Sequence, residues 1–351
     1  MSWITALARP EIQALQPYQH ARWEPGLERL HANELPWRAP LDTSEAGLNR
    51  YPEPHPRALA ARLAAHYEVG AGSVLPCRGS DEAIDLLTRA YCRDGTDAVL
   101  VTPPTFGMYS LAARIQGATI IEVPLRREAG YGLEPAALLA AVTPAVKLVY
   151  LCSPNNPTGN LLERADLLAL ARALEGRALL IVDEAYLEFS GAPSLSAELG
   201  AHPGLVVLRT LSKAYALAGA RCGVLLAHAD IVALLRRVIP PYAITQMTIE
   251  IVLRALQPDS LGVVRERIGA LLRERERLAT ALAGRPGVLR VWPSAANFLL
   301  VDFEDAGAAL ARAHAVGLLL RDLRRAPTLA QSLRISVGTP EQNERLLASL
   351  S

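Results

Sequence analysis

Short apolar runs alternate along the chain with stretches that have a helical pattern of apolar positions, from about residue 57 onward. The runs Leu-Val-Tyr-Leu at 148–151 and Leu-Leu-Ile-Val at 179–182 are apolar at every position, which indicates strands buried on both faces. Such strands alternating with helices predict an α/β fold with a mostly parallel central sheet flanked by helices.

The predicted elements of this part come in one continuous series. The predicted strands are 98–101, 119–123, 147–152, 178–182, 205–209 and 223–226. The predicted helices are 57–67, 81–92, 108–116, 135–142 and 161–174.

The same pattern divides the chain into three parts. Residues 1–44 have little periodicity and are rich in Pro, Trp and His, so we expect an N-terminal arm that joins the small domain. Residues 45–255 form the expected large domain. Residues 256–351 form an expected small C-terminal α+β domain, with a helix at 263–283 and strands at 288–291, 297–301 and 332–337.

Charge and composition narrow the choice of partners. The 36 Lys and Arg residues nearly balance the 35 Asp and Glu residues, and no basic block occurs, so nucleic acid and anionic membranes are not expected partners. No apolar run approaches the roughly 20 residues of a membrane helix, and no charged segment followed by an apolar core opens the chain. We therefore expect a soluble, cytoplasmic protein.

Cysteine and histidine give no sign of a metal site. The four cysteines are scattered without a Cys-x-x-Cys spacing, and the seven histidines include no His-x-x-x-His pair. We expect no bound metal, and reduced thiols in the core. These are Cys77, Cys92, Cys152 and Cys222.

Lysine is rare, and one lysine stands in a suggestive place. Arginine supplies the basic charge except at Lys147 and Lys213. A primary amine condenses reversibly with an aldehyde to a Schiff base, whereas a guanidinium stays protonated. Lys213 lies in a Ser-Lys-Ala run shortly after the strand 205–209, so it is a candidate for this chemistry. A surface lysine at a strand end is the alternative.

Further polar side chains follow other predicted strands. They lie at the carboxyl ends of those strands, where parallel sheets bind ligands. Asp183 ends a buried strand and calls for a cationic partner such as a protonated pyridine nitrogen, or it caps a turn. Tyr186 could then hydrogen-bond a ring oxygen from the same side. Asn156 lies in a loop fixed by two prolines and a glycine, and Phe106 could stack on a flat ring or pack in the core.

Two more features suit an anion. The run Arg-Gly-Ser-Asp-Glu at 78–82 precedes a helix, whose free backbone N–H groups suit a phosphate, although an ordinary N-cap would look the same. Arg334 lies in an apolar strand and needs an anion, either a ligand or a structural salt-bridge partner. An amine for an aldehyde, an acid for a pyridinium and a phosphate site together predict pyridoxal 5'-phosphate.

These motifs resemble those of the fold-type I aminotransferases, and most closely the histidinol-phosphate aminotransferases, over almost the whole chain. The run Ser-Lys-Ala-Tyr-Ala-Leu-Ala-Gly-Ala-Arg at 212–221 is similar to the motif that carries the Schiff-base lysine, and Asp-Glu-Ala-Tyr, Asn-Pro-Thr-Gly and Gly-Ser-Asp-Glu also have counterparts. The resemblance implies a catalytic role for Lys213, Asp183 and Tyr186. It implies cofactor contacts from Ser80, Asp81, Glu82, Phe106, Asn156, Asp183, Tyr186, Thr210, Ser212, Lys213, Arg221 and Tyr51.

The resemblance also implies a homodimer in which Tyr51, in the run Arg-Tyr-Pro-Glu, reaches the site of the partner subunit. The implied substrate contacts are Tyr18, Asn33, Tyr51, Asn156, Arg321, Arg334 and Arg345. The chain departs from the family pattern twice. Phe106 stands where a tyrosine is common, and Asn33-Glu-Leu-Pro replaces Asn-Glu-Asn-Pro.

The implied reaction is amino transfer between L-glutamate and imidazole-acetol phosphate, which gives 2-oxoglutarate and L-histidinol phosphate. An aromatic amino acid aminotransferase would share every catalytic residue, and a threonine-phosphate decarboxylase would use a very similar scaffold. A regulator that keeps the fold as a ligand sensor is a third class, but no basic helix-turn-helix segment precedes residue 17. Fold alone cannot choose among these functions.

Overall fold

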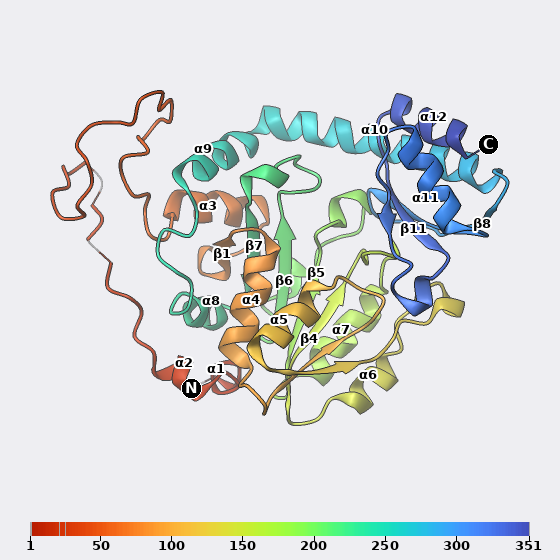
Figure 1. The fold of residues 1–351 in the computed structure, drawn as a ribbon. Helices are drawn as coiled ribbons and strands as arrows, with labels where there is room; N and C mark the ends of the chain where they lie inside the picture. Colours follow the sequence, from red (N-terminus) through yellow and green to blue (C-terminus); the bar gives the residue numbers. More distant parts are fainter. Residues whose placement is uncertain (1, 21, 25, 351) are drawn as a thin grey trace.

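A large sheet and a small sheet, each covered by helices, make up the computed structural model, which describes residues 2–20, 22–24 and 26–350 (Figure 1). The helices are α1 Trp3–Ala6, α2 Pro10–Ala14, α3 Arg57–His66, α4 Ser80–Tyr91, α5 Met108–Gln116, α6 Pro135–Ala141, α7 Arg164–Ala173, α8 Ala229–Leu235, α9 Gln246–Ala255, α10 Pro258–Ala283, α11 Ala306–Ala315 and α12 Pro340–Ser349. Short 3-10 helices are η1 Ala71–Ser73, η2 Arg127–Ala129, η3 Leu187–Phe189, η4 Leu195–Glu198, η5 Ala218–Ala220 and η6 Pro327–Leu329.

The large sheet has seven strands in the order β1-β7-β6-β5-β4-β2-β3. They are β1 Val74–Cys77, β2 Ala98–Val101, β3 Thr119–Glu122, β4 Val146–Cys152, β5 Leu179–Asp183, β6 Leu205–Thr210 and β7 Gly223–Ala227. Strands β3, β2, β4, β5 and β6 are mutually parallel, and β7 is antiparallel to both of its neighbours. The expected mostly parallel sheet is therefore confirmed.

Successive residues of the central strands face opposite helical layers. Val149 packs in the cluster that contains α3, α6, α7 and α9. Its neighbours Leu148 and Tyr150 pack in the cluster of α4, α5 and α8. Because both faces are covered, every residue from Leu179 to Asp183 is buried, which explains the continuous apolar runs in the sequence.

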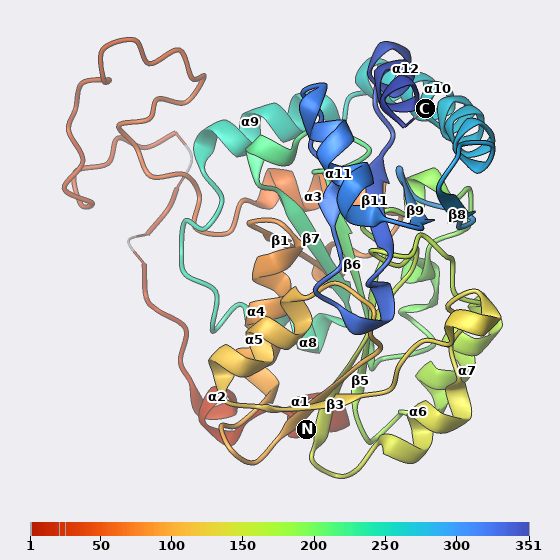
Figure 2. The ribbon, with the colours of Figure 1, turned by 45° about the vertical axis from the view of Figure 1, so that its right-hand side comes forward.

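The small sheet has the order β10-β11-β9-β8 and is antiparallel throughout. Its strands are β8 Val288–Val291, β9 Phe298–Phe303, β10 Arg321–Asp322 and β11 Ser332–Ser336. The long helix α10 runs from α9 to this sheet, α11 also packs on the sheet, and α12 packs on α10 and α11 (Figures 1 and 2). Its separate apolar cluster includes Leu278, Val301 and Leu347.

The N-terminal arm differs from its expected attachment to the small domain. Ile4 is buried in the cluster of α4, α5 and α8, and the backbone N–H of Arg9 donates to the carbonyl of Ala90 at 3.0 Å. The chain after α2 leaves the body as a long irregular segment (Figures 1 and 2). Helices as short as α1 and α2 carry too few turns for a periodic signal, so the sequence did not reveal this packing.

Helix boundaries differ from the sequence prediction where side chains compete for the backbone. Helix α7 begins at Arg164 rather than at 161, because the N–H of Leu162 donates to the Ser153 hydroxyl at 3.0 Å and keeps this segment extended. Strands β2 and β8 and helix α5 have the predicted bounds.

The four cysteines are free and buried, and burial raises the pKa of each thiol. Over the described ranges of the chain, no helix combines the length and apolar character needed to cross a membrane.

Candidate active site

A cavity of about 470 Å³ lies beyond the carboxyl ends of β4, β5 and β6. The start of α4, the start of α5 and the β10–β11 edge of the small sheet complete its wall. It brings together twelve of the residues predicted from the sequence, which lie up to 254 positions apart, from residue 80 to residue 334. These are Ser80, Asp81, Phe106, Asn156, Asp183, Tyr186, Thr210, Ser212, Lys213, Arg221, Arg321 and Arg334.

Asp183 is the buried acid of the cavity, with only 2% of its surface exposed. Its carboxylate accepts hydrogen bonds from the Tyr109 hydroxyl at 2.8 Å and from the backbone N–H of Ala185 at 3.1 Å. Burial outweighs these bonds and raises the pKa of Asp183 to about 6. Among the described residues no ion pair with Asp183 forms, so a cationic ligand atom would be stabilised beside it.

Tyr109 is a site residue to which the sequence analysis gave no role. It lies in α5 with no exposed surface, stacks on Tyr150 at 4.8 Å between ring centroids, and meets Phe106 edge-on at 5.7 Å. The available signal was its spacing: Phe106 and Tyr109 are three residues apart at a helix start, which puts them on one side. Tyr109 thus links the Phe106 ring to the Asp183 carboxylate.

Lys213 lies three residues after β6, with its amine 5.7 Å from the centre of the Tyr186 ring. Burial and the neighbouring charge of Arg334 lower the pKa of Lys213, and Arg221 adds to this effect while Asp81 and Asp183 oppose it. A lowered pKa increases the neutral fraction of the amine, which is its nucleophilic form.

The start of α4 forms a cradle for an anion. Its N-cap, Gly79, has a φ of 78° and offers no side-chain cap to the free N–H groups. Gly223 lies directly opposite, where an added Cβ would come within 2.4 Å of the Ser80 backbone nitrogen. Arg221 reaches the same place, with Nη2 3.3 Å from Asp81 Oδ2. Uncapped N–H groups and a guanidinium suit a phosphate.

Arg334 and Arg321 are cross-strand neighbours at the mouth of the cavity. The Arg334 guanidinium donates to Asn156 Oδ1 and lies 5.2 Å from the centre of the Phe298 ring. Within the described part of the chain, no carboxylate pairs with either arginine, which excludes the structural salt bridge considered from the sequence. Burial lowers the pKa of Arg334, as does the nearby charge of Arg321.

Five of the predicted residues do not line this cavity. The buried Glu82 instead accepts from the backbone N–H of Arg78 at 2.6 Å and from its Nε at 2.7 Å, so it holds the turn before α4. Arg345 is exposed on α12. Tyr18 and Tyr51, with 72% and 52% of their surface exposed, and Asn33, also exposed, lie in the N-terminal segment.

The lining fits pyridoxal 5'-phosphate. A buried carboxylate without a cation matches a protonated ring nitrogen, and the Phe106 ring offers an apolar face. The amide of Asn156 accepts from Arg334 and keeps its own N–H₂ group for the cavity. The tight approach of Gly223 to the start of α4 leaves the backbone N–H groups open to a phosphate.

Comparison with known proteins decides the family. The model of the family described as aminotransferase class I and II matches residues 33–350. The chain belongs to this family. The aminotransferase chain is 49% identical to a histidinol-phosphate aminotransferase of Stenotrophomonas maltophilia (strain R551-3), over 99% of this chain and 96% of that protein. It is 48% identical to one from Xylella fastidiosa (strain 9a5c), with the same coverage.

Solved structures agree with the fold of this aminotransferase. Histidinol-phosphate aminotransferase from Clostridium acetobutylicum aligns with a TM-score of 0.79 at 20% identity, over 86% of this chain and 90% of that one. The enzyme from Sinorhizobium meliloti, solved in complex with pyridoxal-5'-phosphate, aligns with a TM-score of 0.78 at 26% identity, over 86% and 82% of the two chains. These likenesses confirm the fold-type I architecture predicted from the sequence.

Proposed function

We propose that this chain is a histidinol-phosphate aminotransferase that uses pyridoxal 5'-phosphate. It transfers an amino group between L-histidinol phosphate and 2-oxoglutarate, giving imidazole-acetol phosphate and L-glutamate, in L-histidine biosynthesis. Relatives with 45–49% identity over 99% of the chain carry that name. The observation that carries the substrate assignment is the pair Arg321 and Arg334, which lacks any carboxylate partner among the described residues and opens into the cavity of Lys213.

Both substrates end in an anion that these arginines suit. Glutamate presents a carboxylate where histidinol phosphate presents a phosphate ester. The planar fork of Arg334 donates two parallel hydrogen bonds to either group. Arg321 brings a second positive charge within reach, which a phosphate dianion uses more fully than a carboxylate does.

When bound, the cofactor supplies an aldehyde that takes up the amino group and a ring that accepts electrons from the substrate Cα. Lys213 acts as the base that removes the proton from Cα and returns it, and its lowered pKa increases the fraction of free amine available for this step. Asp183 holds the ring nitrogen in its charged form. Tyr186, whose pKa is raised by burial, remains a hydroxyl donor toward the cavity.

A spectrum and a substrate panel test this function. Purified protein supplied with pyridoxal phosphate is expected to absorb in the visible range, and borohydride is expected to abolish that band and add the cofactor mass to Lys213. Lys213→Ala should lack the band and lose about 10⁴-fold in turnover. Lys147→Ala is the matched control because it changes the other lysine of the chain.

The substrate panel separates the related activities. With glutamate as donor, histidinol phosphate formation should exceed phenylalanine formation. Faster turnover of the aromatic substrate, or release of carbon dioxide from threonine phosphate, would contradict the proposal. If the protein with Lys213 intact never binds pyridoxal phosphate, the proposed function is wrong.

We also propose a homodimer in which Tyr51 reaches the cavity of the partner subunit. Tyr51 stacks on Tyr242 at 4.7 Å between ring centroids, and its backbone N–H donates to Glu34 at 2.7 Å. Glu34 also pairs with Arg29 and Arg50, so this exposed segment has a defined shape. Large apolar side chains project from it and would be covered by a second copy. These are Leu30, Leu35, Trp37 and Leu41.

Subunit complementation tests whether Tyr51 reaches the cavity of the partner subunit. Two inactive variants, Lys213→Ala and Tyr51→Ala, are mixed after unfolding and refolded together. If Tyr51 serves the partner, each mixed dimer has one intact site, and activity recovers toward about half of the wild-type value per mixed dimer. No recovery in dimers shown by mass to be mixed would contradict the crossing. The same segment carries Tyr18 and Asn33, for which we propose substrate contacts.

We propose a division into a large domain at 45–255 and a small domain at 256–351, supported by the separate apolar cluster of the small sheet. We propose the cytoplasm as the compartment, supported by four free thiols, which a reducing compartment preserves.

A further inference from the structure

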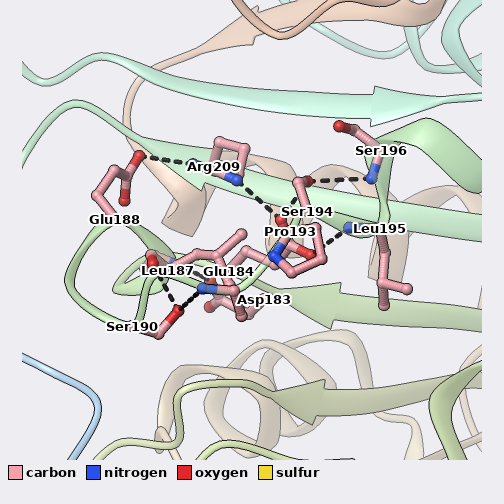
Figure 3. Close-up of polar contacts among 12 residues, drawn as sticks. Asp183, Glu184, Leu187, Glu188, Ser190, Pro193, Ser194, Leu195, Ser196 and Arg209 are labelled. Carbon is pink, nitrogen blue, oxygen red and sulfur yellow. Dashed lines mark hydrogen bonds and ion pairs between the residues drawn. The ribbon is translucent and has the colours of Figure 1, made fainter. Parts of the chain in front are cut away.

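A buried charge cluster lies behind the cavity, on the other side of the ends of β5 and β6. Arg209 has 6% of its surface exposed and Glu184 has 2%. Figure 3 shows the Arg209 guanidinium between Glu188 on one side and the Glu184 and Ser194 pair on the other. Its Nη1 donates to Glu184 Oε2 at 2.9 Å, and its Nη2 donates to Glu188 Oε1 at 2.6 Å.

Each member of this cluster is close in sequence to a residue that lines the cavity. Glu184 directly follows Asp183, and Glu188 lies two residues after Tyr186. Arg209 directly precedes Thr210 on β6, four residues before Lys213. Adjacent residues at a strand end point to opposite sides, so one side carries the chemistry and the other carries the ion pairs.

Further bonds fix the cluster to the rest of the fold. Glu184 also accepts from the Ser194 hydroxyl at 2.5 Å and from the backbone N–H of Leu195 at 2.8 Å. The Arg209 guanidinium lies 5.1 Å from the centre of the Tyr67 ring on the loop after α3.

The Lys213 loop has a second anchor on the same side. Tyr215, two residues after Lys213, shares a hydrogen bond of 2.7 Å with His66 Nε2. Burial and the charges of Arg209 and Arg62 lower the pKa of His66 to about 4, so the imidazole is neutral at physiological pH.

Stability alone does not account for two buried charges and a third, Glu188, that is partly buried. Removing ions from water is costly, and apolar residues of similar size often stabilise a core as well or better. A guanidinium fork differs from an apolar contact because its bonds have fixed directions. Here two such bonds join the loop after β5 to the strand that leads to Lys213, and an apolar side chain would let these loops slide past one another.

We infer that Arg209 is a positioning residue, which sets the Lys213 loop against the Asp183–Tyr186 loop from behind the cavity through Glu184 and Glu188. The inference rests on the proposed function, because it concerns how the lysine and the acid are held relative to each other for the cofactor. It assigns no contact between Arg209 and the cofactor or the substrate.

The chain offers a direct measure of Lys213 without any turnover. Its two lysines are resolved by peptide mass, so the pH dependence of amine labelling in cofactor-free protein reports Lys213, with Lys147 as internal reference. The groups that face Lys213 are Arg334, Arg221, Asp81, Asp183 and Tyr186. If the Lys213 loop moves away from these groups and becomes more exposed, the pH midpoint of Lys213 labelling should shift toward 10.5, the ordinary pKa of a lysine amine.

In Arg209→Met we expect the Lys213 labelling midpoint to rise by about half a pH unit or more, and the dissociation constant of pyridoxal phosphate to increase at least about tenfold. Arg209→Lys keeps the charge and should recover part of both. The matched control is Arg127→Met, which removes an ion pair to the buried Asp302 on β9, outside the cavity. It should lower the melting temperature without moving either readout.

Folded Arg209→Met with the wild-type midpoint and cofactor affinity would overturn the inference. If that variant does not fold, Glu188→Gln takes its place, because it keeps the side-chain volume and the Arg209–Glu184 pair; a smaller shift in the same direction is expected, and no shift overturns the inference. Wild-type protein that fails to bind pyridoxal phosphate would instead contradict the proposed function. The two failures are thereby distinguished.

Discussion

Arg209 and Arg334 are both largely buried arginines near the ends of the central strands, yet their surroundings differ. Arg209 donates to two carboxylates, whereas Arg334 donates to an amide and lies near an aromatic ring. Both leave Nε without a partner, so the difference lies in the acids. Burial alone would lower the pKa of Arg209, but Glu188 and Glu184 outweigh it and raise the pKa; for Arg334 burial prevails and the pKa is lowered.

The comparison shows how an internal charge pair differs from a ligand site. Behind the cavity, the charges of Arg209, Glu184 and Glu188 neutralise one another. In the cavity, Asp183, Lys213, Arg321 and Arg334 are close together without matching ion pairs among the described residues. A protein tolerates such an arrangement where a ligand completes it, and pyridoxal phosphate with an anionic substrate brings the complementary charges.

The largest effect is expected from removing the Arg209 guanidinium from its ion pairs with Glu184 and Glu188. Arg209→Met leaves the buried Glu184 and the partly buried Glu188 without their arginine, and we expect a loss of about 3–5 kcal/mol in the free energy of unfolding of the cofactor-free protein. Urea denaturation measures it. Arg164→Met removes a partly exposed pair with Glu198 and should cost less than about 1 kcal/mol. Similar losses in both variants would contradict the distinction.

The next largest effect is expected from Arg334, the arginine that lines the cavity. Arg334→Met removes the anion fork, and we expect kcat/KM to fall about 100-fold, or roughly 2.7 kcal/mol, for both glutamate and histidinol phosphate. Because no carboxylate loses its partner, the free energy of unfolding should stay equal or rise. Steady-state kinetics and urea denaturation of the same preparation check both points, and a stability loss like that of Arg209→Met would show that the comparison is wrong.

Asp183 should give the cofactor-free protein a characteristic pH dependence. Its pKa is raised from 3.8 to about 6 when folded, so the folded chain retains a proton that the unfolded chain loses. The resulting stabilisation is complete below pH 3.8 and is lost as the pH rises through about 6, which amounts to about 1–3 kcal/mol. Asp183→Asn should remove this decline from unfolding curves recorded between about pH 4 and pH 7. An unchanged slope would mean that Asp183 ionises as it does in water.

The smallest effect separates the two substrates. Arg321→Ala should lower kcat/KM about tenfold for histidinol phosphate, roughly 1.4 kcal/mol, and less than about threefold for glutamate, because the dianion gains more from a second cation. Parallel kinetics with both amino donors measure the ratio. Equal losses would assign Arg321 a general role rather than a phosphate-selective one.

Residues at the ends of strands were the most predictable from the sequence. Asp183, Asn156 and Lys213 each lie at or after the end of a buried strand, and parallel strands bring such residues to one edge. Tyr109 and the Arg209 cluster depend on which side of an element faces which neighbour, and no single run of residues shows that. The same limit explains Glu82, which has the right spacing for the cavity but turns to Arg78, and Arg345, which lies on the exposed side of α12.

The buried thiols give this chain a set of internal reporters. A thiol reacts as its thiolate, and burial both hides Cys77, Cys92, Cys152 and Cys222 and raises their pKa. Reagent uptake at neutral pH therefore records transient opening of the protein rather than surface chemistry. Cys222 lies in the cluster on one side of the large sheet and the other three lie in the cluster on the opposite side, so the order of modification during denaturation tells which helical layer detaches first.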